Sequence, residues 1–356
     1  QASRLDWFTP PKTAANVRKS GMADWFPDGQ VNVSHLALDA QINAGRGDQV
    51  ALYYDSPVTN TQANYTYNQL KEAVADFAGA LKAQGVNTGD RVVIYLPMIP
   101  QAAIAMLACA RIGAIHSVVF GGFAAHELAV RIDDAKPKAI VTASCGVEVN
   151  KVLEYKPIVD RAIEEATHKP DAVIVHQRPE CTANLSKPGD IDWQDAVRNA
   201  EPAAPVALPS THPLYILYTS GTTGKPKGVV RDHGGYATAL NFSMDYVYGL
   251  KPGDTFFTAS DVGWVVGHSY IVYGPLIFGC STVLYEGKPV NTPDAGAFWR
   301  IIEQYKAKAV FSAPTAFRAI KKEDPNGKFL ERYDISSLER IYMAGERLDP
   351  ATYEWT

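Results

Sequence analysis

The sequence predicts an α/β protein made of packed βαβ subdomains. From about residue 50, short apolar runs alternate with segments whose apolar residues recur at helical spacing. A Pro- and Gly-rich connection at 177–213 separates two such alternating blocks. The length of 356 residues also exceeds one ordinary core. We therefore expect an irregular packed arm at 1–47, a first subdomain at 48–213 that includes the connection, and a second subdomain at 214–356.

The first block predicts a succession of parallel βαβ units. A strand is expected at 50–54. A helix follows at 67–84, where apolar residues recur at helical spacing up to Gly85. Further strands are expected at 91–96, 116–120, 139–143 and 173–176, and further helices at 101–112, 125–134 and 158–166. In such a sheet, ligands bind where the strands end at their carboxyl termini.

The second block resumes the alternation. Strands are expected near Phe256, Val283, Val310 and Ile341. Helices are expected at 236–246, 295–305 and 316–322. Neither block contains an internal repeat or a low-complexity tract, so a solenoid is excluded.

The bulk composition limits the classes of partner. With 46% hydrophobic and 20% charged residues the chain is typical of a folded globular protein, and a net charge of -4 gives no general attraction for nucleic acid or anionic membrane. Uncharged runs at 92–110 and 262–285 are long enough to raise the question of a membrane span, but prolines and glycines interrupt both. The four cysteines lack metal-binding spacing, which favours a reducing compartment.

Residues 218–229 read Tyr-Thr-Ser-Gly-Thr-Thr-Gly-Lys-Pro-Lys-Gly-Val and lie between an apolar run at 214–217 and a helix expected from about Gly234. This order predicts a strand-to-helix turn. Its glycines allow close backbone approach, its hydroxyls donate hydrogen bonds and its lysines add charge, so a polyphosphate can bind there. The alternative is a flexible polar surface loop. Pro226 after Gly224-Lys225 excludes the Walker pattern.

This run resembles the phosphate-binding signature of the AMP-forming adenylating enzymes, the superfamily of acyl-CoA synthetases, firefly luciferase and peptide-synthetase adenylation domains. The resemblance implies the large N-terminal domain of the adenylate-forming acyl-CoA synthetase fold, with segment 1–47 wrapped around it. It also implies ATP as substrate, with Mg²⁺, held through its β- and γ-phosphates by Thr219, Ser220, Gly221, Thr222, Thr223, Gly224 and Lys225. Of these, Thr219 and Lys225 are the catalytic candidates.

A second marker is the run at 260–270, where a strand ends, a Gly-rich bend presents Trp264 and a helix begins. Such an indole can wall a small apolar pocket, although core aromatics are commoner. In short-chain acyl-CoA synthetases the matching residues lie at the acyl site, which implies Trp264, Val265 and Val266 here. Acetyl-CoA synthetases have Thr in place of Val266. His268 is expected to be structural or to shape the pocket, because a carboxylate nucleophile needs no base.

A third marker, Gly345-Glu346-Arg347, follows a strand near Ile341 and precedes a helix start at Asp349-Pro350. It resembles the adenine-binding Gly-Glu-Pro of the family, so Gly345, Glu346 and Arg347 are expected to line the adenine. Arg347 replaces the proline and adds a cation that can stack on the base.

A glycine turn at 119–123 is the fourth marker. The resemblance assigns it to the passage for the pantetheine of coenzyme A, with Gly122 nearest. Counting from this turn puts Glu148 and Lys151 where acetyl-CoA synthetases use arginines, and Val290 where they have Asn. The expected CoA set is therefore Gly122, Glu148, Lys151, Val266 and Val290, and no residue is assigned to a metal.

Runs at 144–148, 154–157, 285–290 and 292–296 resemble the propionyl-CoA synthetase branch more than acetyl-CoA synthetases. The expected reaction is ligation of propionate, or next of acetate, to CoA through an acyl-adenylate, releasing AMP and pyrophosphate. The alternatives are a carrier-protein-loading adenylation enzyme and a non-catalytic nucleotide-binding remnant. Expected partners are small molecules, without nucleic acid or membrane insertion, in the cytoplasm or mitochondrial matrix; oligomeric state is not predicted.

The resemblance also implies sequence beyond Thr356. That part would hold a Thr-Glu motif contacting phosphate and Mg²⁺, a ribose-binding Asp, a hinge and a C-terminal domain with an adenylation lysine. On this expectation the large domain is truncated, and the polypeptide alone does not catalyse the full reaction.

Overall fold

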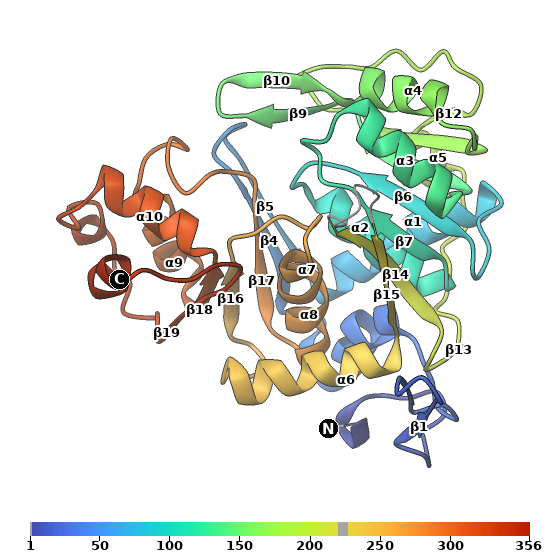
Figure 1. The fold of residues 1–356 in the computed structure, drawn as a ribbon, viewed down its shortest axis with the longest axis horizontal. Coiled ribbons are helices and arrows are strands. Elements are labelled where there is room, and N and C mark those ends of the chain that lie inside the picture. Colours follow the sequence, from blue (N-terminus) through green and yellow to red (C-terminus); the bar gives the residue numbers. More distant parts are fainter. Residues whose placement is uncertain (1, 220–226) are drawn as a thin grey trace.

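The structure is a computed structural model that describes residues 2–219 and 227–356, and it contains two large sheets (Figure 1). The first sheet has the strand order β12-β11-β8-β6-β7-β14-β15. Its strands are β6 (Arg91–Tyr95), β7 (Ile115–Val118), β8 (Ala139–Ala143), β11 (Ala172–His176), β12 (Asp190–Asp192), β14 (Pro213–Thr219) and β15 (Lys227–Asp232). All neighbours pair in parallel except β15, which runs antiparallel to β14.

The second sheet has the strand order β19-β18-β16-β17-β4-β5. Its strands are β4 (Val50–Ser56), β5 (Thr61–Thr66), β16 (Thr255–Thr258), β17 (Ser281–Tyr285), β18 (Ala307–Ser312) and β19 (Arg340–Met343). Here β5 is the antiparallel edge strand, and the other pairs are parallel. Both sheets are therefore of the mixed type in which a parallel core carries one antiparallel edge.

The main core lies between the two sheets and is filled by α1 (Tyr67–Ala83), α2 (Pro100–Ile112) and α8 (Gly274–Phe278). Helix α2 is buried along almost its whole length, which explains its apolar sequence on every face. Strand β6 shows how the sheet separates two cores: Val92 and Ile94 face the main core, while Val93 and Tyr95 face the outer one.

Two smaller clusters cover the outer faces. Helices α3 (Ala125–Ala135) and α4 (Tyr155–Glu165) pack on the first sheet. Helices α9 (Ala297–Tyr305) and α10 (Pro314–Glu323) pack on the second. The remaining helices and turns are α5 (Trp193–Arg198), α6 (Gly234–Phe242), α7 (Val265–Gly267), α11 (Pro350–Trp355), η1 (Ala2–Arg4), η2 (His35–Asp39), η3 (Ile42–Arg46), η4 (Ser243–Val247), η5 (His268–Tyr273) and η6 (Leu330–Arg332).

Three short ribbons complete the fold. In the N-terminal arm, β1 (Ala15–Val17) pairs with β2 (Ala23–Trp25), and β3 (Gln30–Val31) pairs with β13 (Leu208–Pro209). Strands β9 (Cys145–Glu148) and β10 (Lys151–Glu154) form a separate hairpin that lies at one end of the molecule in Figure 1. Within the described ranges 2–219 and 227–356, no helix combines the length and apolar composition of a bilayer span.

Two expectations from the sequence were wrong, and one strand was missed. The signature at 218–229 does not lead directly into a helix, because β15 intervenes and pairs with β14, with Thr219 opposite Lys227. Residues 177–213 are not merely a connection: they supply β12 and α5, and Trp193 stacks on Phe77 with ring centroids 3.6 Å apart. Finally, strand β5 was not predicted, since its residues are mostly exposed and polar.

The expected subdomain boundary at 213/214 does not separate the strands of the two sheets. Strands β4 and β5 come from the first block but lie in the second sheet. Strands β14 and β15 come from the second block but lie in the first sheet. The two sheets are thus interleaved along the chain, and the end of the phosphate signature belongs to the same sheet as the glycine turn after β7.

Candidate functional site

A cavity of about 210 Å³ lies where strands of both sheets end. From the first sheet it is lined by Phe120, Gly121 and Gly122, which follow β7. From the second sheet it is lined by Ser260 and Asp261 after β16, and by the residues 286–289 after β17. The β9 hairpin contributes Val147 and Glu148. Carboxyl ends of parallel strands are where α/β proteins bind ligands, so this cavity is the candidate site.

The glycine turn after β7 is stabilised by hydrogen bonds from the side chain of Tyr95. Its hydroxyl donates to the main-chain oxygens of Gly121, at 3.0 Å, and Phe123, at 2.8 Å. A Cβ on Gly121 would overlap the hydroxyl of Tyr155, and a Cβ on Gly122 would overlap the ring of Phe120. Glycine is therefore required at both positions by close packing around the cavity.

Trp264 begins a tight turn beside this cavity. Its main-chain N–H donates to the main-chain oxygen of Asp261 at 3.0 Å, and its own oxygen accepts from the N–H of His268 at 3.0 Å. The indole is 46% exposed. It lies 5.6 Å from the ring of Phe120 and 6.4 Å from that of Phe123, measured between centroids. The expected bend that presents an indole is confirmed as local geometry.

The structure separates the three predicted acyl-pocket side chains. Trp264 turns toward the aromatic residues of the glycine turn. Val265 lines a different hollow, of about 830 Å³, together with residues of α6 and of the N-terminal arm. Val266 is partly buried and packs against a cluster that contains Met244 and Phe311. An acyl pocket that uses all three remains a prediction.

Of the predicted CoA residues, Gly122 and Glu148 line the cavity together. Lys151 lies opposite Glu148 across the β9–β10 hairpin and is exposed. Val290 is partly buried and packs against the outer core of the second sheet. Their roles toward CoA remain predictions.

The predicted adenine residues follow β19. Gly345 has a φ of 104°, a conformation that favours glycine. Glu346 accepts a hydrogen bond from the N–H of Thr315, in the first turn of α10, at 2.8 Å, and forms an ion pair with Arg318 at 2.5 Å. Arg318 lowers the pKa of the Glu346 carboxyl. Arg347 is exposed. These contacts show how Glu346 is oriented, while adenine binding by Gly345, Glu346 and Arg347 remains a prediction.

Only the first of the predicted phosphate-binding residues, at the end of β14, is among the described residues. Thr219 is the last residue of that strand and is exposed. Ser220, Gly221, Thr222, Thr223, Gly224 and Lys225 lie outside the described residues. Because β14 pairs with β15, the signature connects two neighbouring antiparallel strands.

Sequence reasoning assigned no role to two other acidic residues of the cavity lining, Asp261 and Glu286. Glu286 lines it directly after β17, and its carboxylate accepts from Arg178 at 2.7 and 3.1 Å and from the hydroxyl of Tyr54 at 2.6 Å. Asp261 also lines it, and burial raises the pKa of this carboxyl to about 6 although the Gly263 N–H and Lys288 act in the opposite direction. A signal was available, since both acidic residues come shortly after a buried apolar strand.

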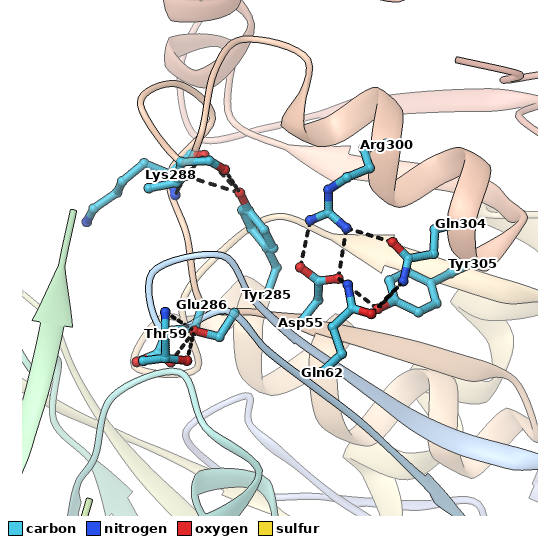
Figure 2. Close-up of polar contacts among 11 residues, drawn as sticks. Asp55, Thr59, Gln62, Tyr285, Glu286, Lys288, Arg300, Gln304 and Tyr305 are labelled. Atoms are coloured by element: carbon cyan, nitrogen blue, oxygen red, sulfur yellow. Dashed lines mark hydrogen bonds and ion pairs between the residues drawn. The ribbon is translucent and has the colours of Figure 1, made fainter. Parts of the chain in front are cut away.

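A second polar cluster fixes the neighbouring helix α9. In Figure 2 the guanidinium of Arg300 faces the carboxylate of Asp55, with distances of 2.6 and 2.9 Å. Tyr305 and Gln62 donate to the same carboxylate at 2.7 and 2.8 Å. These bonds connect α9 to the end of β4. The segment after β17 leads into α9, so its far end is attached to β4 through these bonds.

No group of three or more His, Cys, Asp or Glu side chains within the described part of the chain could hold a metal ion. The described residues therefore supply no ready-made set of three such ligands for the Mg²⁺ that the resemblance implies.

Comparison with known proteins identifies the family of the chain. The family described as AMP-binding enzyme matches residues 38–356, and the one described as acetyl-coenzyme A synthetase N-terminus matches residues 1–37. The chain belongs to the AMP-binding enzyme family. The resemblance to short-chain AMP-forming acyl-CoA synthetases that the sequence predicted is confirmed.

Three similar proteins give a more specific comparison than the family alone. The chain is 50% identical over 356 residues to human acyl-CoA synthetase short-chain family member 3, mitochondrial, covering 100% of this chain and 52% of the relative. It is 48% identical over 358 residues to propionate–CoA ligase of Escherichia coli K12, covering 100% and 56%. The structure of acetoacetyl-CoA synthetase from Streptomyces lividans matches with a TM-score of 0.88 and 30% identity, covering 99% and 53%. The chain thus spans about half the length of these relatives.

Proposed function

We propose that the complete natural protein ligates a short-chain carboxylate to coenzyme A, with propionate preferred and acetate next. A carboxylate oxygen first attacks the α-phosphorus of ATP, which gives an acyl-adenylate and pyrophosphate. The thiol of CoA then displaces AMP and forms the thioester. The cavity shared by both sheets carries this proposal, because its lining joins the predicted CoA residues Gly122 and Glu148 to the segment that leads into Trp264.

In this proposal the residues of the chain bind and orient the substrates. The signature from Thr219 to Lys225 holds the triphosphate, and Gly345, Glu346 and Arg347 hold the adenine. Trp264, Val265 and Val266 select the acyl chain by size. Phosphoryl transfer depends mainly on positioning and on stabilisation of the developing negative charge, and Mg²⁺, when bound, would supply part of that stabilisation.

The name of the Escherichia coli relative, propionate–CoA ligase, supports propionate as first choice. The human relative is named as mitochondrial, and the predicted compartments of this chain are the cytoplasm and the mitochondrial matrix.

Two assays on the complete natural protein test the proposal. Acid-dependent exchange of pyrophosphate into ATP, without CoA, reports the adenylation step. Thioester formation with CoA as sole thiol reports the second step and excludes a carrier-protein-loading enzyme. We expect the highest kcat/KM for propionate, then acetate. A preference for butyrate or longer acids would contradict the short-chain assignment, and binding of an acyl-AMP analogue without turnover would favour a nucleotide-binding remnant.

A further inference from the structure

Asp261 lies where two predicted subsites meet. Asp261 lines the 210 Å³ cavity together with Gly122 and Glu148. Its main-chain oxygen accepts the N–H of Trp264 at 3.0 Å, so it also holds the turn that presents the indole. A thiol that arrives through the cavity and an acyl group held beside Trp264 would meet at this residue.

The carboxylate has one oxygen engaged and one available. Oδ1 accepts the N–H of Gly263 at 2.7 Å. Among residues 2–219 and 227–356, the side chain makes no other hydrogen bond or ion pair, which leaves Oδ2 able to accept. The environment is crowded: a Cβ on Gly267 would overlap the main-chain oxygen of Asp261, and one on Gly263 would lie 3.0 Å from Oδ1. The hydrogen bond from Gly263 therefore holds Oδ1 in place, while close packing against Gly267 holds the main chain of Asp261.

The charged and titratable groups that share the cavity come from three elements. Tyr285 ends β17 and is followed by Glu286 and Lys288, Glu148 belongs to β9, and Tyr155 begins α4. The negative charge of Glu286 is paired with Arg178. Burial is the main influence on Asp261 and raises its pKa to about 6, while Lys288 acts to lower it.

We infer that Asp261 is a catalytic residue of the thioester-forming step, in which its Oδ2 takes the proton of the incoming thiol. This inference rests on the proposed function. As the S–H bond breaks, the sulfur attacks the carbonyl carbon of the acyl-adenylate and the C–O bond to the phosphate of AMP breaks. The products are the thioester, AMP and a protonated Asp261, which then returns its proton to solvent.

The chemistry needs such a group because the thiolate, not the thiol, is the nucleophile, and an ordinary thiol with a pKa of about 8.5 is mostly protonated at neutral pH. A general base works best when its pKa lies near the working pH. The Asp261 carboxyl is closer to that condition than an ordinary carboxyl with a pKa of about 3.9. Positioned proton transfer typically accelerates a reaction about 100- to 10,000-fold.

The test is Asp261→Asn in the complete natural protein. The asparagine side-chain oxygen can still accept from Gly263, so the turn is kept while the proton acceptor is lost. We expect acid-dependent pyrophosphate exchange to stay within about twofold, and CoA-dependent thioester formation to fall about 100-fold. In the wild type, kcat/KM for CoA should rise with pH to a plateau above about pH 6, whereas in the variant it should keep rising up to the pKa of the thiol, about 8.5.

Asp294→Asn is the matched control. Asp294 makes the same short turn, with its Oδ1 accepting the N–H of Gly296 at 2.8 Å, and it is outside the cavity lining. This variant should leave both steps and the pH profile unchanged.

Two results would decide against the inference, and a third would decide against the proposed function. If exchange and thioester formation fall together in Asp261→Asn, the residue has a structural role. If neither falls, it takes no proton. A wild-type protein without either activity would instead overturn the proposed function itself.

Discussion

Arg178 and Glu286 form a buried bidentate ion pair that joins a strand end of one sheet to a strand end of the other. Arg178 follows β11 and Glu286 follows β17. Their side chains are 5% and 6% exposed. The hydroxyls of Tyr54 and Ser56 donate to the same carboxylate at 2.6 and 2.9 Å. Figure 2 shows Glu286 next to Thr59, on the segment that continues to Lys288. The pair therefore fixes the distance between the two sheets at the candidate cavity.

Removal of one partner should destabilise the protein strongly. Arg178→Met leaves the Glu286 carboxylate buried without its cation, and we expect the free energy of unfolding to fall by about 3–5 kcal/mol. Urea unfolding measures this change. Lys308→Met is the control, because Lys308 and Glu339 form a solvent-exposed pair whose loss should change the free energy of unfolding very little. Equal losses in the two variants would mean that the buried pair has no special role.

Replacement of Trp264 by Gly should shift the acid preference toward longer chains. The indole is the largest side chain of the turn, and its removal creates space next to Phe120 and Phe123. We expect kcat/KM for butyrate to rise relative to propionate, as measured in the complete natural protein. Phe8→Gly is the control, since Phe8 is also an exposed aromatic and lies outside the lining of both cavities. An unchanged chain-length profile would place the acyl group elsewhere.

Arg318→Met should weaken ATP binding without removing the predicted adenine residue. Arg318 pairs with Glu346, but both side chains are about one-third exposed, so the pair contributes little more than an ordinary surface ion pair. We expect KM for ATP to rise about twofold to fivefold in pyrophosphate exchange, with kcat nearly unchanged. Lys321→Met, on the same helix α10, should have no effect. An effect confined to CoA would argue that Glu346 belongs to another subsite.

The buried side chain of His268 should make the free energy of unfolding decrease in acid. His268 donates from Nδ1 to the main-chain oxygen of Trp264 at 3.1 Å, and its Nε2 is buried without a partner among the described residues. Burial lowers the pKa of His268 from 6.5 to about 4. Between these values the unfolded chain binds more protons than the folded one, so stability decreases as pH decreases.

The variant His268→Asn isolates this contribution. Asparagine has no titrating group, and the stability difference between wild type and variant should shrink by about 2 kcal/mol from pH 7 to pH 5. Urea unfolding at both pH values measures it. The buried His233 titrates in both proteins and largely cancels in the difference, because its pKa is lowered by burial and by His212 and not by His268. Parallel pH dependences would show that His268 is not kept neutral by burial.

Sequence patterns predicted local structure well where one physical rule dominates. Helix α1 has apolar residues at helical spacing and a strand before it, and β8 occupies the expected residues 139–143. The glycine turn at Gly122 and the bend at Trp264 could be placed because glycines that closely follow an apolar strand mark a change of chain direction.

The pairing of distant strands could not be predicted in this way. That β14 continues into β15 depends on hydrogen bonds with a partner strand, and the exposed, polar residues of β15 give no apolar signal. Likewise, Arg178 and Glu286 are 108 residues apart in the sequence, and a buried ion pair leaves no periodic pattern. The sequence therefore indicated only part of the cavity lining, including Gly122 and Glu148, and not the acidic residues Asp261 and Glu286.

The position of β4 in the second sheet has a consequence for biosynthesis. Leu52 pairs with Thr282, about 230 residues later, so during translation β4 has no parallel partner until β17 leaves the ribosome. At about 5–20 residues per second, that interval is roughly 12–46 s. Throughout it, the hairpin of β4 and β5 presents the unpaired edge of an apolar strand to solvent, and a chaperone that shields nascent strands would increase the yield of this protein.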